Sequence, residues 1–185
     1  MALWIILGII ALFIIWIVSM YNGFVKARMK IDNSWSDISV FLKKRFDLIP
    51  NLVNTVKGYA AHESQTLERV IQARNAAASV PSGDVQAAAQ ANQALNGALK
   101  SLFAVAEAYP ELKANQNFLE LQQALQNIEG DLGNARRYYN ATVRDYNTSI
   151  QQFPGVILAN MTGFDPRGFF ELDDKAEAKN IEVKF

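Results

Sequence analysis

The fold is decided by residues 118–153, "FLELQQALQNIEGDLGNARRYYNATVRDYNTSIQQF". Core-forming side chains return at alternating steps of three and four along this stretch, which is the spacing of one face of an α-helix. The row consists of Phe118, Leu121, Leu125, Ile128, Leu132, Ala135, Tyr139, Thr142, Tyr146, Ile150 and Phe153. Strand-like alternation of apolar and polar residues is not sustained anywhere in the chain. The pattern predicts one long α-helix and an all-α protein.

Three further rows of the same spacing precede this one. They lie within residues 21–49, 52–71 and 85–109. Pro110 marks a break before the last row, and proline suits the first turn of a helix. Pro50 either starts a new helix or kinks a longer one. We expect a break, because four segments of about 26, 30, 26 and 42 residues suit an antiparallel four-helix bundle.

Residues 75–97 are rich in Ala, Gln and Asn. They include "VPSGDV" at residues 80–85, which combines turn residues with Asp84, a good N-cap. This composition predicts a helical hairpin of small residues with a loose tip. A disordered linker is the alternative.

The first 25 residues carry no charged side chain. A helix that spans a membrane needs about 20 mostly apolar residues, and residues 2–20 meet that requirement. A cleaved signal peptide is the alternative, but it would have a basic leader and a small-x-small cleavage site, and neither is present. Residues 1–21 therefore predict a transmembrane anchor in contact with the lipid bilayer.

The cations that follow the anchor predict its orientation. Lys26, Arg28 and Lys30 lie at its C-terminal end, whereas the N-terminal side offers only the α-amino group. Because cytoplasmic flanks carry the excess of Lys and Arg, we expect a short external N-terminus, a single pass and a cytoplasmic bundle.

Two parts complete the predicted organisation: a bundle over residues 22–153 and a tail over residues 154–185. The helical pattern ends at Phe153 and Pro154, so the tail is expected to be irregular and to pack near one end of the bundle. Its Phe164, Phe169 and Phe170 either contact lipid headgroups or pack back onto the bundle.

The chemical groups available exclude several classes of site. Eighteen cations balance eighteen anions, and there is no cysteine. His62 is the only histidine, and His62 with Glu63 is too small a set for a zinc site or a general base with its nucleophile. Tyrosines and arginines over residues 136–146 could stack on nucleic acid, but two of the three tyrosines fall on the buried row. We predict no catalytic residue, cofactor, metal or nucleic-acid partner.

Two arginines, Arg28 and Arg45, fall on the contact row, or seam, between helices. A buried charge must be paired, and Glu63, Asp131 and Asp145 are the candidate partners. We expect the arginines to fix helix register; contact with a partner protein's carboxylate is the alternative. The residues expected in the seam or at an interface are Arg28, Trp35, Arg45, Pro50, His62 and Glu63.

Several segments resemble one known family. "YNGFVKAR" (21–28), "WSDISVFLKKRFDLIPNLVNTVKGYAAHE" (35–63) and "RRYYNATVRDYN" (136–147), with the later "FP" and "GF", are similar to the LemA family of bacterial membrane proteins. The resemblance implies one N-terminal transmembrane helix, a long antiparallel bundle, a bacterial plasma-membrane location and a small external N-terminus. It implies no established enzymatic activity.

Together these features favour a membrane-anchored helical scaffold or protein-interaction module, with an unidentified protein partner. A homo-oligomeric assembly that organises the membrane is the first alternative. An enzyme or enzyme subunit that uses His62 is the second, and we predict that the protein is not an enzyme.

Overall fold

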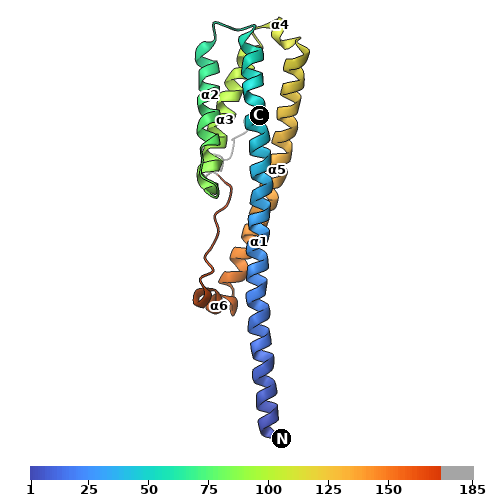
Figure 1. Ribbon diagram of the computed structural model, residues 1–185, viewed down its shortest axis with the longest axis vertical. Coiled ribbons are helices and arrows are strands. Elements are labelled where there is room, and N and C mark those ends of the chain that lie inside the picture. The colour runs from blue at the N-terminus through green and yellow to red at the C-terminus, as the bar shows by residue number, and fades with distance from the viewer. Residues whose placement is uncertain (172–185) are drawn as a thin grey trace, which may run out of the picture. The chain divides into compact units, whose positions relative to one another are not determined.

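The computed structural model describes residues 1–171, and this part of the chain consists of six helices and no strand (Figure 1). The helices are α1 (Ala2–Lys57), α2 (Ser64–Ala78), α3 (Val85–Ala106), α4 (Pro110–Lys113), α5 (Gln116–Gln151) and α6 (Gly155–Thr162). The all-α prediction is confirmed. Backbone contacts divide the chain into two compact units. We call residues 1–45 with 125–169 the anchor unit, and residues 46–124 with the described residues 170 and 171 the hairpin unit.

α1 does not break at Pro50, so the predicted break is wrong. Proline has no backbone N–H, and the helix therefore loses the hydrogen bond to the carbonyl oxygen four residues earlier, on Phe46. In the structure the Nε of Arg74, from α2, donates to this carbonyl at 3.3 Å. The side chain replaces the missing backbone donor, and α1 continues through Pro50 to Lys57.

The second helix is shorter than the row over residues 52–71 predicts. Residues 58–63 form a turn-rich connection, and α2 begins at Ser64. The row misleads because Tyr59 and Glu63 keep the spacing of three and four residues across the connection, although neither side chain is buried. Two hydrogen bonds hold this connection: Asn115 Nδ2 donates to Tyr59 Oη at 2.9 Å, and Tyr109 Oη donates to Glu63 Oε1 at 3.3 Å.

α2 and α3 form the hairpin that the small residues predict. Gly83 has a φ of 94° in the turn, a conformation that favours glycine. Asp84 caps α3 by accepting a hydrogen bond from the Ala87 backbone N–H at 2.9 Å. Pro110 occupies the first turn of α4, and the Phe103 and Phe118 rings pack edge to face between α3 and the start of α5.

In the anchor unit, α1 and α5 run antiparallel. Arg45 contacts Glu129, Trp35 contacts Tyr139, and Ser34 shares a hydrogen bond with Thr142, so later residues of α1 meet earlier residues of α5. The buried row between them contains Phe24, Ile31, Ile38, Leu42, Leu132, Tyr139, Val143, Tyr146 and Ile150. The antiparallel packing predicted from periodicity is therefore present for these two helices.

The tail is more ordered than expected over residues 155–162, which form α6. α6 escaped the periodicity analysis because it has only eight residues and lacks a polar face. Gly163, with a φ of 74°, ends it in the left-handed conformation typical of a helix C-terminus. The remainder of the tail beyond residue 171 lies outside the described residues.

A short strap, residues 163–168, follows α6 and is fastened to α5. Tyr139 Oη donates to the Gly168 carbonyl and Tyr146 Oη to the Asp165 carbonyl, both at 3.0 Å. Asn147 exchanges two hydrogen bonds with the Arg167 backbone, at 2.8 and 2.9 Å. Burial raises the pKa of both tyrosines, so their hydroxyl groups keep the protons that they donate.

The three tail phenylalanines differ in their surroundings. Phe164 is buried, with its ring 5.5 Å from both Tyr21 and Phe24 of α1. Phe170 is buried and belongs to the hairpin unit, whereas Phe169 is exposed. Phe164 and Phe170 therefore pack on protein, which is the second of the two alternatives.

The repair of α1 by Arg74 can be tested with a double-mutant cycle. Arg74→Met leaves the Phe46 carbonyl without its donor, and we expect a loss of about 1–2 kcal/mol in the free energy of unfolding. In a Pro50→Ala background the Ala amide supplies the donor, so the same substitution should cost less by about 1 kcal/mol. Denaturation of the full chain in detergent, followed by circular dichroism, measures both. Equal costs in the two backgrounds would contradict the repair.

Candidate functional site

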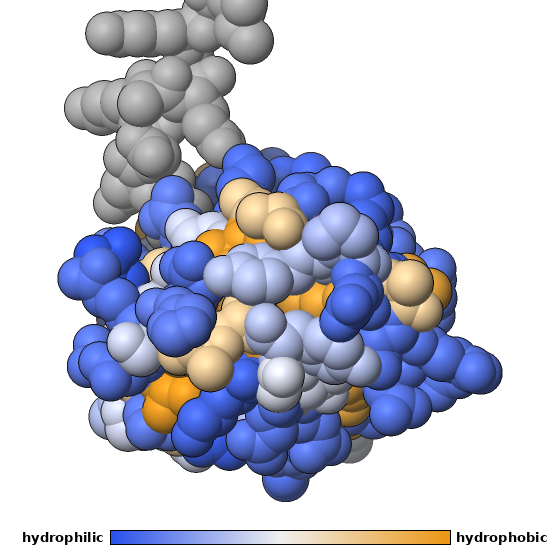
Figure 2. All heavy atoms as spheres, turned by 90° about the horizontal axis from the view of Figure 1, so that it is seen from above, coloured by the Kyte–Doolittle hydropathy of each residue, from blue (hydrophilic) through white to orange (hydrophobic). Residues whose placement is uncertain are grey.

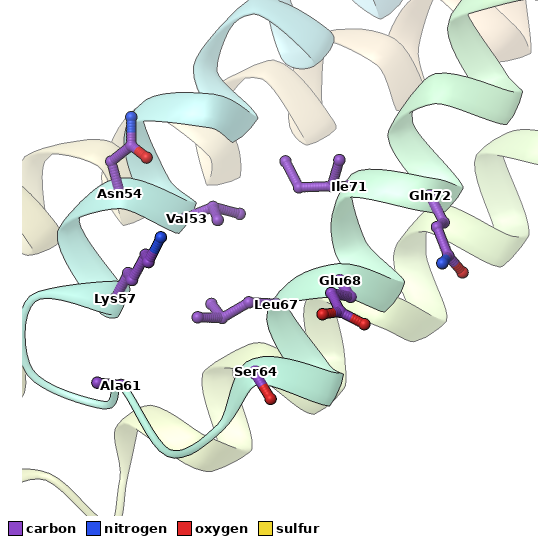
Figure 3. Close-up of a pocket in the computed structure, with 9 residues that line it drawn as sticks. All are labelled: Val53, Asn54, Lys57, Ala61, Ser64, Leu67, Glu68, Ile71 and Gln72. Atoms are coloured by element: carbon purple, nitrogen blue, oxygen red, sulfur yellow. The ribbon is translucent and has the colours of Figure 1, made fainter.

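A groove of about 450 Å³ lies between the C-terminal turns of α1 and the first half of α2 (Figure 3). Val53, on α1, faces Leu67 and Ile71, on α2, across the gap. These three side chains form an apolar floor. The other lining residues are Asn54, Lys57, Ala61, Ser64, Glu68 and Gln72.

The polar residues of the groove are ordered by helix spacing. Ser64, Glu68 and Gln72 follow one another at four-residue intervals on α2, beside the apolar pair Leu67 and Ile71. Lys57 extends from α1 on the opposite side. The groove therefore has an apolar floor with a cation on one wall and a carboxylate on the other.

The end of the molecule that carries α4 offers no comparable apolar surface. Seen from that end, it is mostly hydrophilic, and its hydrophobic patches are small and separate (Figure 2). Ion pairs such as that of Lys113 with Glu107 contribute to this charged surface. The groove between α1 and α2 is thus the better candidate for binding a protein.

Arg45 is the buried charge that the sequence predicts, but its partner differs from the three candidates. Its Nη1 lies 2.8 Å from Glu129 Oε2, on α5. The arginine is only 5% exposed, whereas the glutamate side chain is 45% exposed. Burial lowers the pKa of Arg45, and the Glu129 carboxylate acts in the opposite direction. The guanidinium remains charged, because arginine does not lose its proton in proteins.

The ion pair has a consequence for register. If α5 slipped by one turn against α1, Leu125 or Gly133 would take the place of Glu129. Neither side chain can accept a hydrogen bond from Arg45. The alternative registers would bury Arg45 without the Glu129 carboxylate, and the loss of such a pairing is the way a single polar residue selects alignment in helical bundles. The register function of Arg45 stays a prediction, supported by this geometry.

The other predicted seam residues fall in different places. Arg28 is exposed, so the expectation of a second buried arginine is wrong. Trp35 is half-buried, with its ring 5.7 Å from that of Tyr139. Pro50 lies inside α1, where it frees the carbonyl that Arg74 binds.

His62 and Glu63 occupy the connection between α1 and α2. His62 is exposed, and the Glu63 carboxylate accepts the hydrogen bond from Tyr109. Burial and this carboxylate raise the pKa of Tyr109, which keeps the phenol protonated as the donor. Within residues 1–171 no group of three or more His, Cys, Asp or Glu side chains could hold a metal ion. Here Glu63 has a structural contact that accounts for its position.

Sequence reasoning missed the groove, since its floor residues lie within the single row over residues 52–71, which predicts one helix. The connection at residues 58–63 is what turns α2 back and opens the gap. "VKGYAAHES" could have signalled it, because Gly58, Tyr59 and His62 are weaker helix formers than alanine. The strap contacts of Asn147 and Arg167 were also missed.

Comparison with known proteins places the chain in a family. The sequence profile of the LemA family matches residues 34–185, which is most of the chain. The chain belongs to the LemA family. The resemblance noted from the sequence is thereby confirmed, and the LemA match includes Arg45, Glu129 and every residue of the groove.

Three relatives are similar over most of this LemA-family chain. Magnetosome protein MamQ 2 of Paramagnetospirillum magneticum is 26% identical over 90% of this chain and 70% of its own length. Magnetosome protein MamQ of Magnetospirillum gryphiswaldense is 25% identical over 85% of this chain and 67% of its own. Protein LemA of Metamycoplasma hominis is 25% identical over 71% of this chain and 60% of its own.

These similarities agree with the apolar start of α1. Among the described residues, helix α1 is long and apolar enough to cross a membrane. None of the residues in its most apolar stretch is buried by the rest of the protein. The family and the relatives support a membrane-associated helical protein. None of the family or protein names denotes an enzyme.

The ion pair predicts an asymmetry between its two partners. Glu129→Gln removes the Glu129 carboxylate from the buried Arg45 and should lower the free energy of unfolding by about 1–2 kcal/mol, less than for a fully buried pair because Glu129 is half-exposed. Arg45→Met removes the buried charge and should cost less, while helix content stays unchanged and the unfolding transition broadens. Denaturation monitored by circular dichroism measures both quantities.

Lys44→Met is the matched control, since Lys44 is exposed one residue before Arg45. Its effect should stay within about 0.5 kcal/mol. A sharp, fully cooperative transition for Arg45→Met would count against the register function.

Proposed function

We propose that this LemA-family chain is a membrane-anchored interaction module whose groove between α1 and α2 binds an amphipathic helix of a partner protein. The observation that carries the proposal is the groove itself: an apolar floor of Val53, Leu67 and Ile71 between walls of opposite charge. Grooves of this kind receive the apolar face of a helix, with anchoring residues one turn apart.

The charges of the groove restrict the partner. A helix seated on the floor would place a basic side chain toward Glu68 and an acidic side chain toward Lys57. Rim charges of this kind contribute to the rate and specificity of association more than to affinity. The partner that fits is therefore a helix with apolar residues at four-residue spacing and opposite charges on its two edges.

The anchor gives the module its location and orientation. Residues 2–20 would cross the bilayer once, with the N-terminus outside and the hairpin unit in the cytoplasm. Lys26, Arg28 and Lys30 support this orientation because all three are exposed directly after the apolar segment. In the sequence of α1, the groove begins at Val53, eight residues after Arg45 and C-terminal to the apolar segment.

Photo-crosslinking in cells tests the groove. A benzoylphenylalanine in place of Gln72, on the rim, should cross-link a specific partner, whereas one at Gln90, exposed on α3, should not. Ile71→Glu places a charge on the apolar floor and should reduce the Gln72 product at least tenfold. Mass spectrometry of the product identifies the partner.

Ala104→Glu is the control for Ile71→Glu, because it adds the same charge at an exposed position of α3. It should leave the cross-link intact. A product that survives Ile71→Glu would argue against the groove, and a product containing a second copy of the chain would favour the homo-oligomeric alternative.

The orientation has a separate test, which the absence of cysteine makes simple. Ser82→Cys lies in the exposed turn between α2 and α3, and Ala2→Cys is at the N-terminal end of the apolar segment. A membrane-impermeant maleimide added to intact cells should label Ala2→Cys and should label Ser82→Cys only after permeabilisation. The reverse pattern would show that the hairpin unit faces outward.

A further inference from the structure

A second groove, of about 520 Å³, lies in the anchor unit between α1 and the segment that contains α6. Four of its residues come from the apolar start of α1 and five from the segment around α6. They are Phe13, Trp16, Ile17, Met20, Phe153, Pro154, Ile157, Leu158 and Met161, all apolar. The volume falls within the range of roughly 300–1,000 Å³ that is typical of small-molecule sites.

The α6 side of this groove carries large apolar side chains whose exposure to water would be unfavourable. Phe153, Ile157 and Met161 are 81%, 54% and 79% exposed. No charged residue occurs between Asp145 and Asp165, a run that includes all of α6. α6 lies beside the C-terminal part of the apolar segment of α1 (Figure 1). Since α1 residues 13–20 belong to the predicted membrane span, α6 is at the depth of the adjoining lipid leaflet.

α6 is held at both ends, so it cannot simply fold onto α1 and close the groove. At its start, a Cβ on Gly155 would come within 2.4 Å of the Ser149 carbonyl oxygen and 3.1 Å of Phe24, which shows how closely the backbone approaches α5 and α1. At its end, Gly163 leads into the strap that Tyr139 and Tyr146 fasten to α5. These contacts hold α6 in place, so the groove is a defined structural feature of the anchor unit.

We propose that an acyl chain of a phospholipid occupies this groove. The proposal rests on the membrane anchoring in the proposed function, because at that depth the surrounding phase consists of acyl chains. An occupant with a polar end also fits what lies next to the groove. A second hollow shares Met20 and continues along α1 to Lys30, where Thr142, Asp145 and Ser149 of α5 also line it.

The two hollows together match an amphiphile. The apolar groove receives the hydrocarbon, and Lys30, which lines the adjoining hollow with its ammonium group 5.4 Å from the centre of the Tyr138 ring, supplies a cation near a lipid phosphate. Met20 and Lys30 are ten residues apart, about 15 Å along a helix. Asp145, whose Oδ1 lies 3.5 Å from Arg144 Nε, also lines the hollow, so a cation and a carboxylate are both present for a headgroup that carries a phosphate and an ammonium group.

The test uses the full chain reconstituted in phosphatidylethanolamine vesicles that contain a trace of the same lipid with a diazirine on one acyl chain. After irradiation, mass spectrometry maps the modified residues. We expect Met161 and Met20, in the groove, to be modified at least fivefold more than Ile15. Ile15 is the matched reference, since it lies between Phe13 and Ile17 on α1 but does not line the groove.

Two variants establish that the groove is responsible. Ile17→Trp fills it from the α1 side and should reduce modification of Met161 at least fivefold. Ile15→Trp adds the same ring two residues away, outside the groove, and should leave Met161 unchanged. Unaltered helix content in both variants shows that the anchor unit remains folded.

The outcomes separate this inference from the anchoring on which it rests. Modification of Ile15 without enrichment at Met161 would overturn the acyl-chain site and leave the anchor intact. Absence of modification throughout residues 2–20 would overturn the anchor as well. Cross-linking of Met161→Cys between two copies by a bifunctional maleimide, with no lipid product at the groove, would show that a second copy occupies it.

Discussion

The antiparallel packing of α1 on α5 in the anchor unit is the interaction on which the arrangement around the membrane depends. Rows of apolar side chains alone tolerate a shift of one helical turn, because each row repeats itself. We expect the contacts of Arg45 with Glu129, and of Ser34 with Thr142, to favour one register over its neighbours. The end of α5 then meets α1 at Phe24, which is where Gly155 must approach closely for α6 to begin. The strap and α6 inherit their positions from this register.

The continuity of α1 is the second constraint, and it depends on a contact from another helix. Pro50 would ordinarily leave the Phe46 carbonyl without a donor, and Arg74 supplies one. Val53, Asn54 and Lys57, which form the α1 wall of the groove in Figure 3, all follow Pro50. The contact that keeps α1 helical past Pro50 therefore also joins α2 to α1 beside the groove. The hydrogen bond from Arg74 to the Phe46 carbonyl therefore contributes both to the fold and to the candidate site.

Periodicity was sufficient to predict the all-α class, the hairpin turn at Gly83 and Asp84, and the row that packs α5 against α1. It could not predict whether the helix breaks at Pro50. Continuation of the helix involves Arg74, which is 24 residues away in sequence and adjacent only in the fold. It also placed Arg28 in the seam, although the residue is exposed. Periodicity could not predict the groove, because apolar residues keep the same spacing whether they belong to one helix or to two helices joined by a short connection. Long-range polar contacts were the common missing information.

The same limitation explains why α6 was missed, and why its position is informative. A helix of eight residues without a polar face gives no amphipathic signal in the sequence. Packing against protein on one side alone leaves apolar side chains exposed on its other side. α1 covers part of its apolar surface, and Ile157 and Met161 remain exposed. In water, burial of these side chains would favour packing α6 more closely on α1 and closing the groove. The close approach at Gly155 and the strap instead hold α6 in its open position. An apolar helix kept open beside a membrane-spanning segment is consistent if hydrocarbon supplies the missing contacts, because acyl chains solvate such a surface without collapse of the protein around it.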